Sequence, residues 1–144
     1  MMPVMINDVS VDCINRAAIL YHIPVPIILS VMKQEGGKNG QAIRNKNGTI
    51  DYGVLQINSI WLPKIAAYGY TRDDIQYNAC TNLLVGVWIL SQGIAQGKNI
   101  WSGIGEYHSH TPDHNRLYRN AIYNTYKKIA VVFSTHDSFS ISSM

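Results

Sequence analysis

The stretch from Asn78 to Gly97 constrains the fold of this chain more than any other segment. It carries apolar side chains at helical spacing on most of its sides, among them Leu83, Val87 and Leu90. A helix that is apolar nearly all round lies inside a protein rather than on its surface. Asn78 has the short polar side chain that caps a helix start. The sequence therefore predicts a domain in which other elements surround this helix.

Further helices are predicted before and after the central one, because apolar residues recur there every three or four positions. The predicted segments are Asp8–His22, Pro26–Glu35, a short piece between Asn58 and Gly69, Trp101–Tyr107 and a last helix that begins after Pro112. Between Lys38 and Ile50 polar residues dominate, and Asn47-Gly48 is a strong turn signal, so we expect a loop or small hairpin there. The fold class is thus mainly α with a small β region.

The length and composition fit one globular domain. The chain has 144 residues, of which 47% are apolar and 15% charged, with a net charge of +3. This is the composition of a folded domain rather than of a disordered or nucleic-acid-binding tail, so no nucleic acid partner is expected. We place the domain at residues 1–133 and expect residues 134–144, which contain five serines, to form a flexible tail.

No membrane-spanning segment is predicted. A spanning helix needs about 18 or more apolar residues in a row, and the most apolar run, Leu20–Met32, is interrupted by His22, Pro24 and Pro26. Residues 1–11 lack the basic segment followed by an apolar stretch that marks an export signal. The sequence on its own gives no route of export.

Cys13 and Cys80 are the only two cysteines. As a disulfide they would close a long loop in the unfolded chain, which would stabilise the folded state by roughly 4 kcal/mol. Such a bond would favour an oxidising compartment. As free thiols they would fit a protein of the cytosol. Their spacing leaves both interpretations open, and two cysteines without clustered histidines do not make a zinc site.

Glu35 is the strongest candidate for an acid catalyst. It is predicted at the C-terminus of a helix that Gly36 ends, where the helix dipole disfavours a negative charge. Apolar neighbours such as Val31 and Met32 would desolvate it, and both effects raise a carboxyl pKa. An acid that protonates a glycosidic oxygen must hold its proton near neutral pH. The alternative is an ordinary surface glutamate at a helix end.

Asp51 is the candidate for a second carboxylate. It follows the expected turn by a few residues and precedes Tyr52-Gly53. A chain that turns back there would place Asp51 across a cleft from Glu35, as in glycosidases that use two carboxyl groups. The alternative is a simple turn residue.

Three motifs occur in order along the chain: Gln34–Gly37, Gly53–Asn58 and Gly105–His108. Together they resemble the lysozyme-like lytic transglycosylases, and most closely those attached to secretion, conjugation and pilus systems. The resemblance covers roughly residues 10–130. It implies a mainly helical fold with a small loop or hairpin region beside a glycan-binding groove, in a periplasmic or secreted protein that acts on peptidoglycan.

The resemblance also implies roles for individual residues. Glu35 matches the catalytic glutamate, and Tyr107 matches a tyrosine near it. The expected groove residues are Tyr52, Gln56, Asn58 and His108. Cys13 and Cys80 match a cysteine pair of some secretion-associated members, which favours the disulfide.

Two positions depart from the family pattern. Gly36 stands where the family usually has serine, and His108 stands where it usually has asparagine. Three functions therefore remain open: a lytic transglycosylase in which Glu35 acts as acid and base, a lysozyme-type hydrolase in which Asp51 assists Glu35, and a component of such an apparatus that binds peptidoglycan without cleaving it. An unrelated helical interaction domain is the fourth, less favoured interpretation.

The remaining aromatic and histidine residues carry weaker expectations. Trp61 and Trp101 are candidates for stacking on sugars, although a Trp at helical spacing is more often part of a core, where we place Trp88. The group His108, His110 and His114 lacks a recognisable zinc pattern. We expect no metal or other cofactor, a monomer, and no partners beyond glycan strands and proteins of a secretion, conjugation or pilus machinery.

Overall fold

The computed structural model describes the backbone of residues 3–97, 99–108 and 112–142, and the side chains in these ranges except those of residues 106, 108, 112–115 and 133–142. The elements in chain order are β1 (Met5–Ile6), β2 (Val9–Ser10), α1 (Val11–Tyr21), α2 (Val25–Glu35), β3 (Ala42–Arg44), β4 (Ile50–Tyr52), β5 (Ile57–Asn58), the 3-10 helix η1 (Ser59–Trp61), α3 (Leu62–Ala66), α4 (Arg72–Tyr77), α5 (Ala79–Gln96), α6 (Ile100–His108) and α7 (Pro112–Ser142). The fold is mainly α with a small sheet, as predicted.

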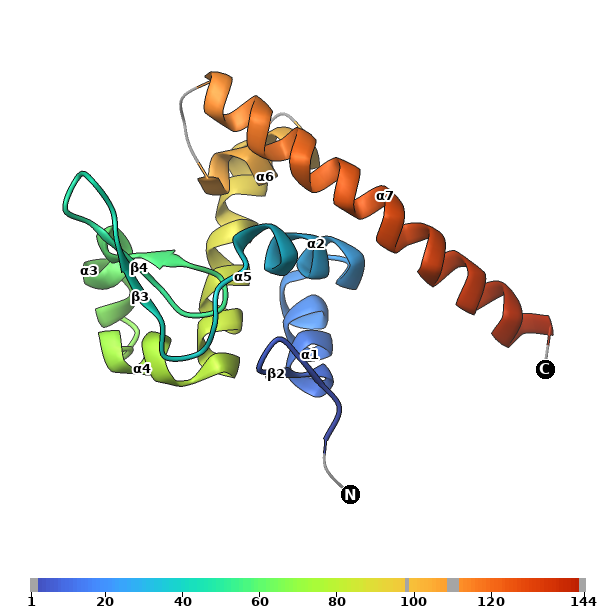
Figure 1. Ribbon diagram of the computed structural model, residues 1–144, viewed down its shortest axis with the longest axis horizontal. Helices are drawn as coiled ribbons and strands as arrows, with labels where there is room; N and C mark the ends of the chain where they lie inside the picture. The colour runs from blue at the N-terminus through green and yellow to red at the C-terminus, as the bar shows by residue number, and fades with distance from the viewer. Residues whose placement is uncertain (1–2, 98, 109–111, 143–144) are drawn as a thin grey trace.

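Helix α5 lies at the centre of the molecule, as its apolar surface predicts. Figure 1 shows it between the strands and short helices on one side and α1 and α2 on the other. It packs against α1, α4 and α6, and its buried residues include Leu83, Val87 and Leu90. The Asn78 side chain accepts a hydrogen bond from the Thr81 backbone N–H and caps the helix start.

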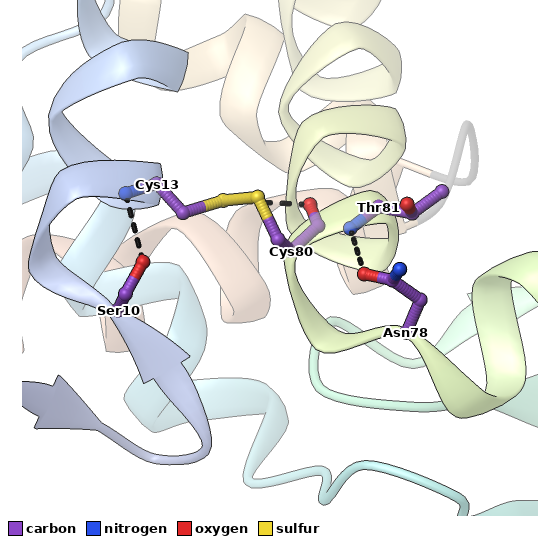
Figure 2. The surroundings of a disulfide bond; sticks show 5 residues. All are labelled: Ser10, Cys13, Asn78, Cys80 and Thr81. Atoms are coloured by element: carbon purple, nitrogen blue, oxygen red, sulfur yellow. Dashed lines mark hydrogen bonds between the residues drawn. A yellow bond between two sulfur atoms is a disulfide. The ribbon is translucent and has the colours of Figure 1, made fainter. Parts of the chain in front are cut away.

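A disulfide joins Cys13 to Cys80 and thereby connects the first turns of α1 and α5 (Figure 2). The two cysteines are 67 positions apart in the chain. Both helix starts are capped by a side chain. Ser10 accepts a hydrogen bond from the Cys13 backbone N–H at the start of α1, and Asn78 accepts one from the Thr81 backbone N–H at the start of α5. The bonded pair that the family resemblance favoured is thus the one present.

The N-terminal hairpin is an element that the sequence analysis missed. Strands β1 and β2 pair antiparallel, and the turn between them contacts the loop that follows α2. Asn7 donates a hydrogen bond to the Gly37 carbonyl at 3.0 Å, and Asp8 accepts one from the Asn39 N–H at 3.2 Å. The hairpin thus supports the segment directly after Glu35.

The small sheet contains β3, β4 and β5 in that order, all antiparallel. The expected hairpin is formed by β3 and β4, with Asn47 and Gly48 in its turn. Asp51 on β4 pairs with Asn58 on β5. Helix α4 was also missed, although its start carries a capping box made by Thr71 and Asp74.

The turn that follows β4 is tied to the core by one buried side chain. The Asn82 amide of α5 accepts a hydrogen bond from the Leu55 N–H and donates to the carbonyls of Tyr52 and Ile75, each at 2.8 Å. Asn82 has no exposed surface. The turn from Tyr52 to Leu55 is therefore held against α5 and the end of α4.

Helix α7 packs on α2 and α6 and extends to Ser142 (Figure 1). Its backbone is helical beyond residue 133, where we placed the end of the domain; that boundary stays a prediction. Within the described ranges, no single helix has the length and apolar character needed to cross a membrane, and α1 with α2 meets that requirement only as a pair bent by 117°.

The disulfide is expected to contribute about 4 kcal/mol to the free energy of unfolding, because it closes a long loop in the unfolded chain. Replacing both Cys13 and Cys80 by Ala should lower that free energy by about this amount in urea unfolding. A reducing agent should destabilise the wild type similarly and leave the double variant unchanged. Equal stability of the oxidised wild type and the double variant would contradict the expectation.

Candidate active site

A cleft of about 390 Å³ lies between α2, the small sheet, α5 and α6. It gathers five of the residues singled out by the sequence: Glu35, Asp51, Gln56, Asn58 and Tyr107. They come from α2, β4, the turn after β4, β5 and α6, so the cleft exists only when these elements are packed together. Trp61, one of the two tryptophans expected as candidates for sugar stacking, also lines the cleft.

Glu35 is the last residue of α2, because Gly36 takes a left-handed conformation and ends the helix there. The carboxyl group is half-buried and accepts a hydrogen bond from the Tyr118 hydroxyl at 2.8 Å. Burial raises the pKa of Glu35 from 4.5 to about 7; the Tyr118 hydrogen bond lowers it, and the nearby negative charge of Asp51 raises it. A large fraction of Glu35 is thus protonated at neutral pH.

Tyr118 was not found by sequence reasoning. It lies on α7, is 6% exposed, and reaches Glu35 because α7 packs on α2. Burial and the adjacent Glu35 raise the pKa of its phenol, so Tyr118 stays neutral and acts as a hydrogen-bond donor. It is one of nine tyrosines, and nothing in its local sequence separates it from the others.

Asp51 and Asn58 form a linked pair on neighbouring strands. Asn58 donates a hydrogen bond to the Asp51 carboxylate at 2.9 Å and another to the Thr49 hydroxyl at 3.0 Å. Its side-chain oxygen caps η1 by accepting from the Ile60 N–H. Asn58 therefore orients Asp51 and the start of η1 in addition to lining the cleft.

Gln56 has a left-handed backbone and donates its side-chain N–H to the Gly53 carbonyl at 2.9 Å. The same turn explains why residue 37 is a glycine. A side chain at Gly37 would collide with the Gly53 carbonyl oxygen and would also crowd the Gln56 amide and the Val54 carbonyl. The second glycine after Glu35 is thus needed for the α2 end to approach this turn.

Tyr107 lines the cleft and donates a hydrogen bond from its hydroxyl to the Leu55 carbonyl at 2.8 Å. Its ring centroid lies 6.4 Å from that of Tyr118. Burial, together with the negative potential of Glu35 and Asp51, raises the pKa of Tyr107 well above its ordinary value. Tyr107 is therefore near the carboxyl group, while Tyr118 is the phenol that bonds to it.

Two other predicted residues, Tyr52 and Trp101, do not line the cleft. Tyr52 is 4% exposed in the core and is not among the residues that line the cleft. Trp101 packs edge-on against Tyr123 and Tyr126 of α7 rather than in the cleft. Trp88 packs on the core but is only partly buried.

The side chains of His108, His110 and His114 fall outside the described residues, and the described residues contain no group of three metal-binding side chains.

The sequence is similar to those of several bacterial proteins. It is 27% identical to "Protein IpgF" of Shigella flexneri over 124 residues, which are 83% of this chain and 82% of that protein. It is 26% identical to "Invasion protein IagB" of Salmonella typhimurium over 129 residues, 86% of this chain and 81% of that protein. A "Putative peptidoglycan-binding-like protein" of Escherichia coli is 28% identical over 106 residues, 68% of this chain and 67% of that protein.

The sequence profile of the transglycosylase SLT domain matches residues 12–129. These residues include all of the described side chains that line the cleft, and they run from the start of α1 far into α7. Since the match covers most of the 144 residues, this chain belongs to the transglycosylase SLT domain family.

Proposed function

We propose that this protein is a peptidoglycan lytic transglycosylase that breaks the β-1,4 bond between N-acetylmuramic acid and N-acetylglucosamine. One observation carries the proposal. Glu35 is a half-buried carboxyl group with a pKa of about 7 at the wall of a polar cleft, as a proton donor to a glycosidic oxygen needs. Membership of the transglycosylase family supports the choice of substrate.

In the proposed reaction Glu35 gives its proton to the oxygen of the leaving sugar as the bond from that oxygen to C1 of the muramic acid breaks. The positive charge that develops on the sugar ring is assisted by the substrate's own N-acetyl group. The carboxylate of Glu35 then takes the proton from the sugar's O6 hydroxyl, whose oxygen forms the new bond to C1. The product carries a 1,6-anhydro ring, and no water is consumed.

Tyr118 fits this double use of Glu35 as acid and then as base. Its phenol donates to one carboxyl oxygen, Oε1, and thereby orients the group. It also stabilises the carboxylate and so moderates the rise in pKa that burial causes. We assign Tyr118 as a residue that positions Glu35.

A lysozyme-type hydrolase is the second candidate, and Asp51 is the observation that favours it. Asp51 shares the cleft with Glu35 and is close enough to affect its pKa. In that mechanism Asp51 would stabilise or attack the positively charged sugar, and water would complete the reaction. The two candidates differ in their products.

The proposed setting is the bacterial periplasm or cell exterior, where the enzyme would open the wall locally for a secretion, conjugation or pilus apparatus. The similarity to a protein named for invasion supports this, as does the disulfide, which persists in oxidising compartments.

Glu35→Gln should abolish cleavage, lowering kcat/KM by about 10³-fold or more, because the amide cannot supply a proton. Mass spectrometry of the soluble products from purified peptidoglycan tests this, with Asp12→Asn as a control for the loss of a surface carboxylate. Anhydro-muropeptides from the wild type would support the transglycosylase, and reducing-end muropeptides the hydrolase.

Asp51→Asn separates the same two mechanisms by rate. A transglycosylase should keep most of its activity, whereas a hydrolase should lose nearly as much as with Glu35→Gln. If neither the wild type nor Asp51→Asn releases products, the protein binds peptidoglycan without cleaving it or has another role.

The activity should fall as the pH rises above about 7, because Glu35 loses the proton that it must donate. Tyr118→Phe removes the hydrogen bond that lowers the pKa, so the fall should move to higher pH. Asp51→Asn removes the charge that raises the pKa, so it should move to lower pH. NMR titration of the Glu35 carboxyl carbon measures these shifts without relying on turnover. Identical titrations in all three proteins would contradict the assigned causes.

Glu35→Gln should also stabilise the protein at high pH. The pKa is 4.5 when exposed and about 7 when folded, so the folded state holds the proton more tightly and the wild type loses stability as the pH rises from about 4.5 to 7. The loss, up to about 3 kcal/mol, is absent in the amide variant. Urea unfolding at pH 4 and pH 8 should show a difference in the free energy of unfolding between the wild type and Glu35→Gln only at pH 8. Equal effects at both values would argue against a buried, protonated Glu35.

A further inference from the structure

A second pocket of about 350 Å³ lies apart from the residues used in the proposed reaction. Its walls come from the end of α1, the loop between α3 and α4, and α5; they include Tyr21, Tyr68, Tyr70, Leu84, Val85 and Trp88. We call it the aromatic pocket. Tyr68 is 71% exposed and Tyr70 is 41% exposed, so two tyrosine rings are presented to solvent rather than packed in the core.

Two further cavities, of about 190 and 370 Å³, share lining residues with the cleft, and the larger of them also shares lining residues with the aromatic pocket. Trp61 lines the cleft and both intervening cavities, and Tyr68 and Trp88 line the larger of these and the aromatic pocket. One wall of the series is α5 from Leu84 to Gln96, a helix length of about 18 Å. Each cavity of the series thus shares lining residues with the next, and we call the four together the track.

Aromatic rings form a row along this track. The Trp88 ring contacts Trp61 edge-on at a centroid distance of 6.1 Å and Tyr68 at 5.8 Å. Such rings offer apolar surface to the faces of sugar rings, and tyrosine and tryptophan add a hydrogen-bonding group. The row therefore has the chemistry of a carbohydrate-binding surface.

Polar groups flank the row. Gln92 and Gln96 are exposed on α5 and offer amide donors and acceptors to sugar hydroxyl groups. The Lys64 ammonium lies 4.8 Å from the Trp61 ring centroid. Among the described residues that line the aromatic pocket and the two intervening cavities, none is acidic. This part of the track therefore has no negative side chain that would repel the carboxylates of peptidoglycan.

We propose that the aromatic pocket binds a distal stretch of the same glycan strand whose scissile bond lies at Glu35. The inference rests on the proposed function for the identity of the polymer. The lining residues shared from the cleft to the aromatic pocket favour a strand over a separate protein partner, because a glycan chain bound at Glu35 would pass along them. The pocket makes the protein prefer long strands to short fragments.

The test measures binding in the Glu35→Gln background, so that the strand stays intact. Peptide-free glycan strands are separated by length, and tetrasaccharides and long strands are titrated by calorimetry into protein with or without Tyr68→Ala. Loss of one aromatic contact should weaken binding of long strands about fivefold. The affinity for tetrasaccharides is the internal reference, because a tetrasaccharide centred on Glu35 extends by only two sugars toward the pocket. Tyr77→Ala is the matched control, because Tyr77 is 61% exposed on α4 and lines none of the four cavities.

A fall in long-strand affinity for Tyr68→Ala but not Tyr77→Ala supports the proposal. Equal affinities of the two variants for long strands would overturn it, and would do so in favour of a protein partner if Tyr68→Ala still impaired the protein in the cell. The product analysis of the wild type decides the proposed function separately. Cleavage without a length effect refutes only the pocket, and a length effect without cleavage refutes only the enzymatic activity.

Discussion

The structure around the cleft depends on the buried side-chain amide of Asn82. This amide makes three hydrogen bonds, to the Leu55 N–H and to the carbonyls of Tyr52 and Ile75. Without the amide, these buried backbone groups would lose a hydrogen-bond partner. An unsatisfied buried polar group costs about 1–3 kcal/mol, so the amide and the turn require each other. This single side chain fixes the turn after β4 relative to α5, the helix around which the other elements pack.

The two elements that carry Glu35 and Tyr107 are positioned against that turn. The end of α2 approaches the Gly53 carbonyl so closely that only glycine fits at position 37. Tyr107 of α6 bonds to the Leu55 carbonyl. The N-terminal hairpin secures the same region from outside, through Asn7 and Asp8. Glu35 therefore sits at a point where α2, α6 and the small sheet are held in fixed relation, and where burial outweighs the Tyr118 hydrogen bond to raise its pKa.

Much of this arrangement follows from local patterns. The helices were predicted because apolar spacing, caps and glycines mark them, and Glu35 was correctly placed at a helix end. Helix α4 has a recognisable capping box at Thr71 that sequence reasoning overlooked. The burial of Tyr52 could also have been anticipated: successive side chains of a strand face opposite sides, so with Asp51 in the cleft its neighbour must face the core. The hairpin of β1 and β2 has two residues in each strand, too few for a periodic signal.

The sequence by itself determined where most helices begin and end, that a glutamate stands at the end of α2, and that the chain carries the ordered motifs of its family. Only the tertiary structure decided that Tyr118 bonds to Glu35, that Asn58 donates a hydrogen bond to Asp51, and that four cavities along α5 share lining residues. The physical reason is distance along the chain. Helix spacing and caps act within a few residues, whereas Glu35 and Tyr118 are 83 positions apart and meet only because α7 packs across α2.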